Sequence, residues 1–125
     1  MTITPLLNVA DVAASVAFYR RLGLEPAERF EDDGVLIWAM LKSGASGLML
    51  NRQDRIHAAS RRARPHYGDA VFYIEVPSAA TMHAALVADG IAATPVERQT
   101  YGLDEFYVRD PDGYELAIAS RVPDG

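Results

Sequence analysis

Apolar residues recur at helical spacing in a segment near the start of the chain. Val12, Val16 and Tyr19 lie three or four residues apart, as they would on one face of an amphipathic helix. Asp11, just before this run, can accept from the free amides of a helix's first turn. Gly23, just after it, can adopt the left-handed conformation that ends many helices. The pattern predicts a helix of about eleven residues.

The same pattern occurs again further along the chain. Ser78 takes the place of the acidic cap, Met82 and Leu86 supply apolar positions, and Gly90 ends the segment. Positions 9, 11 and 23 correspond to positions 76, 78 and 90, since 76 − 9, 78 − 11 and 90 − 23 all give 67. A constant offset between two helix signatures indicates an internal repeat.

Short apolar or alternating runs around both helices predict strands. These runs are residues 3–9, 26–30, 34–42 and 47–51 in the first half, and 70–76, 94–98, 105–109 and 114–119 in the second. Each half therefore has the order βαβββ. We predict an α+β fold with two such modules in tandem, residues 1–51 and 70–120, within a single domain spanning 1–125.

The segment between the modules, residues 52–69, has no strand alternation and carries five arginines and two histidines. We interpret it as an exposed connector with helical character around 58–63. Its basic run has two readings. It is either a solvated linker or a rim that binds an anionic group such as phosphate or carboxylate, which suits the arginine fork.

Composition narrows the class of protein. Hydrophobic residues make up 50% of the chain and charged residues 23%, as in ordinary folded domains. The absence of cysteine excludes disulfides, thiolate metal sites and a cysteine nucleophile, and fits the cytoplasm. No apolar run reaches the ~18 residues that a membrane helix needs, so we expect no membrane partner. A net charge of −5 disfavours nucleic acid as a partner.

Two stretches of the chain resemble a known family. DVAASVAFYRRLGLEP is similar to the first-helix signature of the vicinal oxygen chelate superfamily, which contains glyoxalases, dioxygenases and bleomycin resistance proteins. YGLDEFYVRDPDGYELAIA resembles the superfamily's C-terminal signature and the aromatic–Gly–x–x–Glu–Phe segment of bleomycin resistance proteins. The resemblance implies paired modules whose mixed sheets curl around a cup, and a homodimer. It also implies, in enzymatic members, a divalent metal held in the cup by four His or Glu side chains.

The metal positions of the family can be located here by their spacing from the helix starts and the DPDG turn. They fall on Thr4, Met49, Val71 and Ala117. None of these offers the imidazole or carboxylate that such metals require. Shifting the alignment by one residue brings in no ligand either. We therefore expect no metal and no other cofactor.

Alternate residues of a strand share a face, which predicts the lining of the cup. The candidate ligand-binding residues are Trp38, Met40, Met49, Tyr73, Glu75, Tyr101, Tyr107, Arg109 and Glu115. Aromatic rings among them could stack on a flat ligand, and Glu75 or Glu115 could pair with a cation. The alternatives are that the rings are packing residues and that the carboxylates are solvated or paired with Arg109.

Other catalytic chemistry has little support in the sequence. His57 and His66 match no metal motif, and we expect His83 to be exposed on the second helix. Glu75 is a candidate general base only if it is buried, and we assign no catalytic residue. The function predicted is a metal-free protein that sequesters a small aromatic or cationic compound. The alternative is a glyoxalase-like lyase, isomerase or dioxygenase acting on a small molecule.

Overall fold

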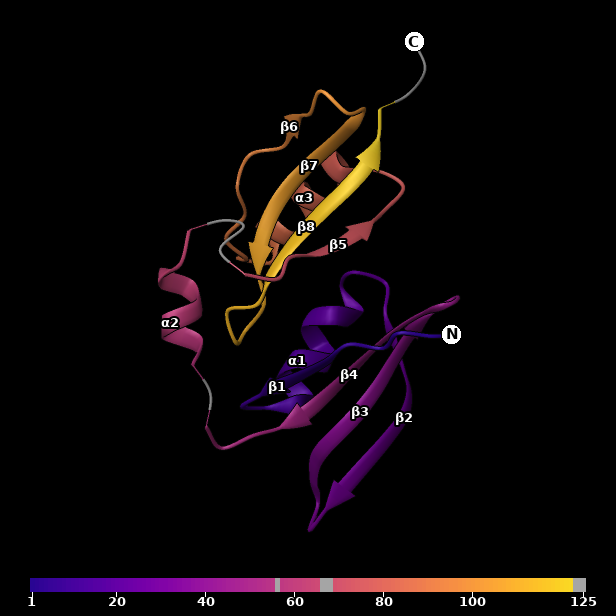
Figure 1. The fold of residues 1–125 in the computed structure, drawn as a ribbon, viewed down its shortest axis with the longest axis vertical. Coiled ribbons are helices and arrows are strands. Elements are labelled where there is room, and N and C mark those ends of the chain that lie inside the picture. Colours follow the sequence, from indigo (N-terminus) through magenta and orange to yellow (C-terminus); the bar gives the residue numbers. More distant parts are fainter. Residues whose placement is uncertain (56, 66–68, 123–125) are drawn as a thin grey trace. The chain divides into compact units, whose positions relative to one another are not determined.

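The computed structural model describes residues 1–55, 57–65 and 69–122, and the chain divides into two compact units, Met1–Ala58 and Ala59–Gly125. In the first unit the elements follow the order βαβββ (Figure 1). They are β1 (Leu6–Val9), α1 (Val12–Arg20), β2 (Glu25–Asp32), β3 (Val35–Ser43) and β4 (Ser46–Arg52).

The second unit begins with the connector helix and then repeats the same order. Its elements are α2 (Ala58–Ala63), β5 (Phe72–Glu75), α3 (Ala79–Ala88), β6 (Glu97–Arg98), β7 (Leu103–Arg109) and β8 (Glu115–Arg121). The helix predicted around residues 58–63 is thus present. Within the described residues, no helix has the length and apolarity needed to cross a membrane.

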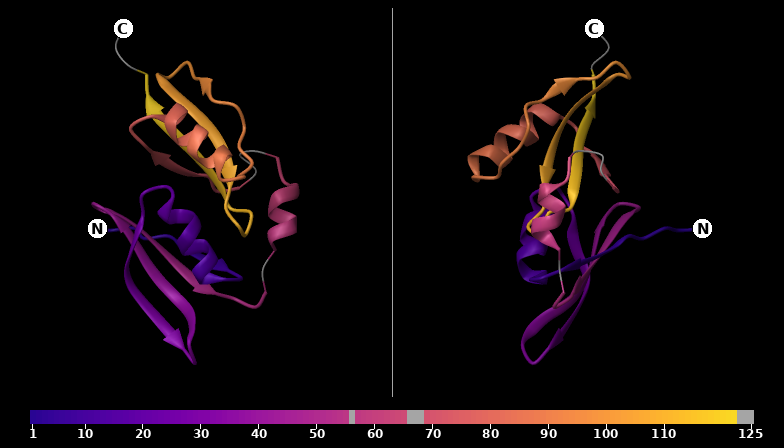
Figure 2. Two further views of the ribbon diagram at one scale, coloured as in Figure 1. Left: turned by 180° about the vertical axis from the view of Figure 1, so that it is seen from behind. Right: turned by 60° about the vertical axis from the view of Figure 1, so that its left-hand side comes forward.

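Each unit has a four-stranded mixed sheet with the same topology. The strand orders are β1-β4-β3-β2 and β5-β8-β7-β6. In both sheets the first strand of the module pairs in parallel with the last, and the other pairings are antiparallel. α1 contacts β3 and β4, and α3 contacts β7 and β8, so each helix packs on its own sheet (Figure 2). This confirms the predicted α+β fold of two βαβββ modules.

The two helices begin and end where the repeat predicts. The carboxylate of Asp11 accepts from the amide of Ala14 at 3.1 Å. The hydroxyl of Ser78 accepts from the amide of Thr81 at the same distance. Gly23, with φ +101°, and its counterpart in the second unit both take the left-handed conformation that lets the chain leave the helix.

The core of the first unit lies between its sheet and α1. Leu7, Leu50 and Ala39 form one cross-strand row and are buried. Val12 and Tyr19 of α1 are also buried. Alternation along the strands therefore puts one face against the helix, where apolar burial stabilises the unit.

The second unit has the same arrangement, with one difference from expectation. Ile74, Ile118 and Phe106 form the equivalent row beneath Leu86 of α3. His83 was expected to be exposed, but it is partly buried and packs edge-on against the Phe106 ring, with centroids 5.0 Å apart. The expectation is wrong because the imidazole lies on the side of α3 that faces the sheet.

Three predicted strands are shorter than expected: the strand predicted at 70–76 is observed as β5 (Phe72–Glu75), and the other two are interrupted at prolines. β1 starts at Leu6 rather than at residue 3, after Pro5, which has no amide to donate. The strand predicted at 94–98 is reduced to β6, because Pro95 interrupts the ladder. The side chain of Thr94 provides a hydrogen bond there in place of the ladder: its hydroxyl accepts from the Tyr107 amide at 2.8 Å.

β6 is held to β7 partly by side chains. Arg98 Nε donates to the Asp104 carboxylate at 3.1 Å. This hydrogen bond, together with the negative charge of Asp104, raises the pKa of Arg98 above its ordinary value. Arg98 is therefore charged in both the folded and the unfolded protein at any ordinary pH.

Candidate functional site

The first sheet has one face away from α1, here called the first helix-free face. Cross-strand partners share a face, so the register places Leu6, Met49 and Met40 in one row across β1, β4 and β3. Met40 and Met49 were both predicted to line a ligand site, and the structure brings them side by side. Both are partly buried, and their flexible thioethers can adapt to irregular ligand shapes.

A second row on this face combines aromatic and amide groups. Asn8, Asn51, Trp38 and Phe30 are partners across the four strands. Asn51 Nδ2 donates to Asn8 Oδ1 at 3.2 Å. The predicted residue Trp38 therefore has an amide pair on one side and a ring on the other. The row offers a stacking surface next to hydrogen-bonding groups, a combination typical of small-molecule sites.

Phe30 is a candidate that the sequence analysis missed. Its side chain is 60% exposed, although it lies opposite Trp38. Register shifts between Pro26 and Glu28, and again after Phe30, break the alternation of β2. Counting by twos along β2 therefore could not place Phe30 on this face, because each β-bulge changes which residues point the same way.

The second sheet likewise has a face away from α3, here called the second helix-free face. Tyr73, Ala117 and Tyr107 form one row across β5, β8 and β7. The two tyrosines were predicted site residues, and they lie on either side of a residue that adds only a methyl group. Two strand spacings, about 10 Å, separate the backbones that carry them.

The next row on this face carries carboxylates. Glu97, Glu105, Ala119 and Glu75 are partners across β6, β7, β8 and β5. Glu105 was not predicted, although it stands two residues before Tyr107 and so shares its face. The hydroxyl of Tyr107 lies 3.4 Å from Glu105 Oε2, within hydrogen-bonding reach. Strand alternation from Tyr107 was the signal that could have found it.

Glu75 was predicted to bind a ligand cation and was considered as a general base if buried. The structure shows it exposed on β5, where Arg121 Nε donates to its carboxylate at 3.2 Å. The condition for the general-base hypothesis is therefore not met.

Glu115 and Arg109, both predicted site residues, are partners at the other end of the second helix-free face. Glu115 is buried. The guanidinium of Arg109 donates to the carbonyl oxygens of Gly113 at 3.0 Å and Arg64 at 2.9 Å. Arg109 is therefore fixed between the β7–β8 turn and the end of the connector helix.

Tyr101 is the predicted site residue that the strands do not carry. It lies in the turn between β6 and β7, and 58% of it is exposed. The structure therefore places it outside the rows formed by Tyr73, Tyr107 and the carboxylates. Its role in binding stays a prediction.

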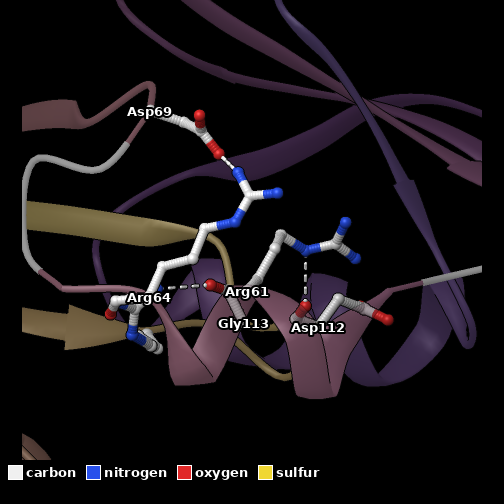
Figure 3. Close-up of polar contacts among 6 residues, drawn as sticks. Arg61, Arg64, Asp69, Asp112 and Gly113 are labelled. Atoms are coloured by element: carbon white, nitrogen blue, oxygen red, sulfur yellow. Dashed lines mark hydrogen bonds and ion pairs between the residues drawn. The ribbon is translucent and has the colours of Figure 1, made fainter.

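The basic connector contacts its own unit. Arg61 Nε donates to the Asp112 carbonyl at 2.9 Å, and the guanidinium lies 4.1 Å from the centre of the Tyr114 ring. Arg62 donates to the Pro111 carbonyl. Arg64 pairs with Asp69, and Figure 3 shows this ion pair together with the bond from Arg61 to Asp112. Arg61 and Arg62 hold the connector helix to the β7–β8 turn, a use that neither reading of the basic run anticipated. His57 is exposed, and His66 lies outside the described residues.

The four metal positions of the family do not fit a divalent ion here. Met49 stands between Leu6 and Met40, and Ala117 stands between two tyrosines. Across residues 1–55, 57–65 and 69–122, no group of three His, Asp or Glu side chains is placed to hold a metal. Hard and borderline metals need such donors.

Comparisons with known proteins give the fold and the family. The family model for the Glyoxalase/Bleomycin resistance protein/Dioxygenase superfamily matches residues 3–118. No protein of curated function matches the chain significantly.

Three solved structures illustrate the likeness. A bleomycin-binding protein complexed with bleomycin is 21% identical, with TM-score 0.68 and coverage of 97% of this chain and 98% of that one. A bleomycin resistance determinant encoded on transposon Tn5 is also 21% identical, with TM-score 0.69 and the same coverages. A lactoylglutathione lyase from Agrobacterium tumefaciens is 22% identical, with TM-score 0.68 and coverages of 96% and 92%. With a family model that spans nearly its whole length, the chain belongs to the Glyoxalase/Bleomycin resistance protein/Dioxygenase superfamily.

Proposed function

We propose that this protein binds and sequesters a small compound with a flat apolar part and a positive charge, without a metal and without transforming it. Each sheet offers binding groups on its own helix-free face. The first contributes Trp38 and the methionine pair, and the second contributes tyrosines and carboxylates. Aromatic and apolar walls with few polar groups are the usual composition of a ligand site.

One observation carries the proposal. Two of the positions at which the family resemblance implies metal ligands lie in rows without carboxylate or imidazole: Met49 between Leu6 and Met40, and Ala117 between Tyr73 and Tyr107. A Lewis acid held there would need several carboxylate or imidazole donors, and neither row supplies one. The side chains instead favour dispersion and stacking contacts with an organic ligand.

The bleomycin-binding relative supports the proposal at the level of the fold, because that protein is seen with bleomycin bound. We include bleomycin among the compounds to be tested for this chain.

We also propose that two copies of the chain associate. Leu6 and Phe30 of the first helix-free face are 45% and 60% exposed, an apolar area that a partner would cover. Light scattering of the purified chain should give the mass of a dimer, and a single-chain mass across micromolar concentrations would contradict this part of the proposal.

The tryptophan fluorescence of the protein offers a direct binding test. Trp38 is the single tryptophan of the sequence and lies on the first helix-free face. A panel of flat aromatic cations, with bleomycin included, should contain compounds that shift or quench its emission in a saturable way. The same compounds should raise the unfolding temperature, because a ligand that binds only the native state stabilises it.

Two variants make this test specific. Trp38→Ala should weaken binding about tenfold, the loss expected when one stacking ring is removed. Val87→Ala, an exposed apolar residue on α3, is the matched control and should bind as the wild type does. Binding unchanged in Trp38→Ala, read by thermal shift, would contradict the proposed site. Conversion of a bound compound into a product, detected by chromatography, would favour the lyase, isomerase or dioxygenase alternative.

A further inference from the structure

Glu105 presents an unusual carboxylate on the second helix-free face. Its side chain is only 1% exposed, and Oε1 is buried without any hydrogen-bond partner in the described structure. Oε2 has the Tyr107 hydroxyl within reach at 3.4 Å. A buried charged oxygen without a donor is costly, so most such groups in folded proteins have one. A hydrogen-bond donor from a bound ligand would therefore satisfy Oε1 and remove this cost.

The cross-strand neighbours of Glu105 increase the negative charge. Glu97 lies directly opposite on β6, and like charges in that relation repel each other. Glu75 lies two strands away in the same row, where Arg121 pairs with it. Within the part of the chain that the structure describes, neither Glu97 nor Glu105 forms an ion pair. The row keeps an excess of negative charge that a cation would neutralise.

The chemistry of the neighbours indicates what kind of cation fits. The described residues provide no group of three metal-binding side chains, which argues against a metal ion at Glu105. The next row contributes the rings of Tyr73 and Tyr107 on the same face. Aromatic rings beside a carboxylate suit an organic cation, whose N–H groups bind the oxygen while its carbon atoms contact the rings.

We propose that Glu105 is the residue of this site that binds the ammonium or amidinium group of the ligand. Oε1 accepts from the ligand's N–H, Oε2 stays with the Tyr107 hydroxyl, and the flat part of the ligand lies against the tyrosine rings. Because Oε1 is buried, binding requires the Glu105 side chain to turn outward, toward the exposed side chains of Glu97, Tyr73 and Glu75 in the same two rows. This inference rests on the proposed binding function and adds the group that selects for charge.

Matched pairs of compounds test the inference apart from the function. Each pair has the same aromatic ring with either an aminomethyl or a hydroxymethyl group, such as 2-naphthylmethylamine and 2-naphthylmethanol. Amide chemical shifts of the full chain, followed by NMR during titration, measure both affinities. The wild type should bind the amines at least about tenfold more tightly than the alcohols, the difference expected for a hydrogen bond to a charged group.

The variants assign that preference to Glu105. Glu105→Gln keeps the shape and removes the charge, and it should abolish the preference by weakening amine binding to the level of alcohol binding. Glu31→Gln, an exposed carboxylate of β2, changes the net charge equally and should keep the preference. Tyr107→Phe provides a second variant if Glu105→Gln folds poorly. It should reduce amine binding more than alcohol binding, because the hydroxyl that orients Oε2 is lost.

The outcomes separate the two proposals. Amines and alcohols that bind the wild type equally well would overturn the role of Glu105 and leave the binding function standing. A preference that survives in well-folded Glu105→Gln, or in Tyr107→Phe when that is the variant available, would also overturn it. No binding by any compound of either kind would contradict the proposed function and this inference with it.

Discussion

The helix-free faces of the two sheets differ in chemistry, although their strands share one order and direction. The first carries Trp38 and a methionine pair, with an amide pair as its polar element. The second carries tyrosines and a row of carboxylates. The faces that meet the helices are alike, because both carry apolar rows that are largely buried. The repeated fold therefore constrains one side of each sheet and leaves the other free to acquire binding chemistry.

The strongest test of this contrast compares the two sides of a strand. Leu50→Ala and Ile118→Ala, equivalent buried positions of the two units, should each lower the free energy of unfolding by about 2–5 kcal/mol. Met49→Ala, next to Leu50 but on the helix-free face, should cost clearly less because its side chain is only partly buried. Urea unfolding followed by circular dichroism measures all three. Equal losses at positions 49 and 50 would break the distinction between the faces.

A smaller loss of stability should distinguish the second unit from the first. The second unit has the connector helix fixed to its β7–β8 turn by Arg61, which both donates to a carbonyl and covers the Tyr114 ring. Arg61→Ala should lower the free energy of unfolding by about 1–2 kcal/mol, from one hydrogen bond and one cation–π contact. Arg55→Ala, an exposed arginine of the same connector, is the control and should have no measurable effect. Equal losses of stability in Arg61→Ala and Arg55→Ala would show that the contacts of Arg61 do not stabilise the fold.

The smallest expected loss of stability comes from removing a helix cap, and it should be the same in both units. Asp11 and Ser78 each cap a helix through one side-chain hydrogen bond of 3.1 Å. Replacing either with alanine should cost about 1 kcal/mol, the usual value for a lost N-cap. Chemical denaturation of the two variants measures this directly. A cost at only one of the two positions would mean that the repeat is matched in sequence but not in energetics.

The fold could be predicted from the sequence because local signals agreed with one another. Helix caps, end glycines and alternation gave the two modules, and the same alternation placed Trp38, Met40 and Met49 on one face. Pro5 and Pro95 are local signals for the shortening of β1 and β6. Whether the residues on these faces bind a ligand stays a prediction.

The rest of the candidate site depends on tertiary structure. Phe30 reaches the first helix-free face only through bulges in β2, which strict alternation cannot foresee. The isolation of Glu105 arises from its register opposite Glu97 and from burial, neither of which is local to the sequence. The arginines of the connector find their partners in a turn about fifty positions away.

The central claim is that this member of the superfamily has no carboxylate or imidazole at the four positions where the family resemblance implies metal ligands. It is tested most directly by the metal content of protein purified without chelators or metal-affinity resin, before and after dialysis against zinc, nickel, manganese or iron. Mass spectrometry of the elements should find far less than one equivalent per chain, because Thr4, Met49, Val71 and Ala117 supply no suitable ligands. About one tightly bound equivalent per chain, the stoichiometry of a single four-ligand site, would contradict the account.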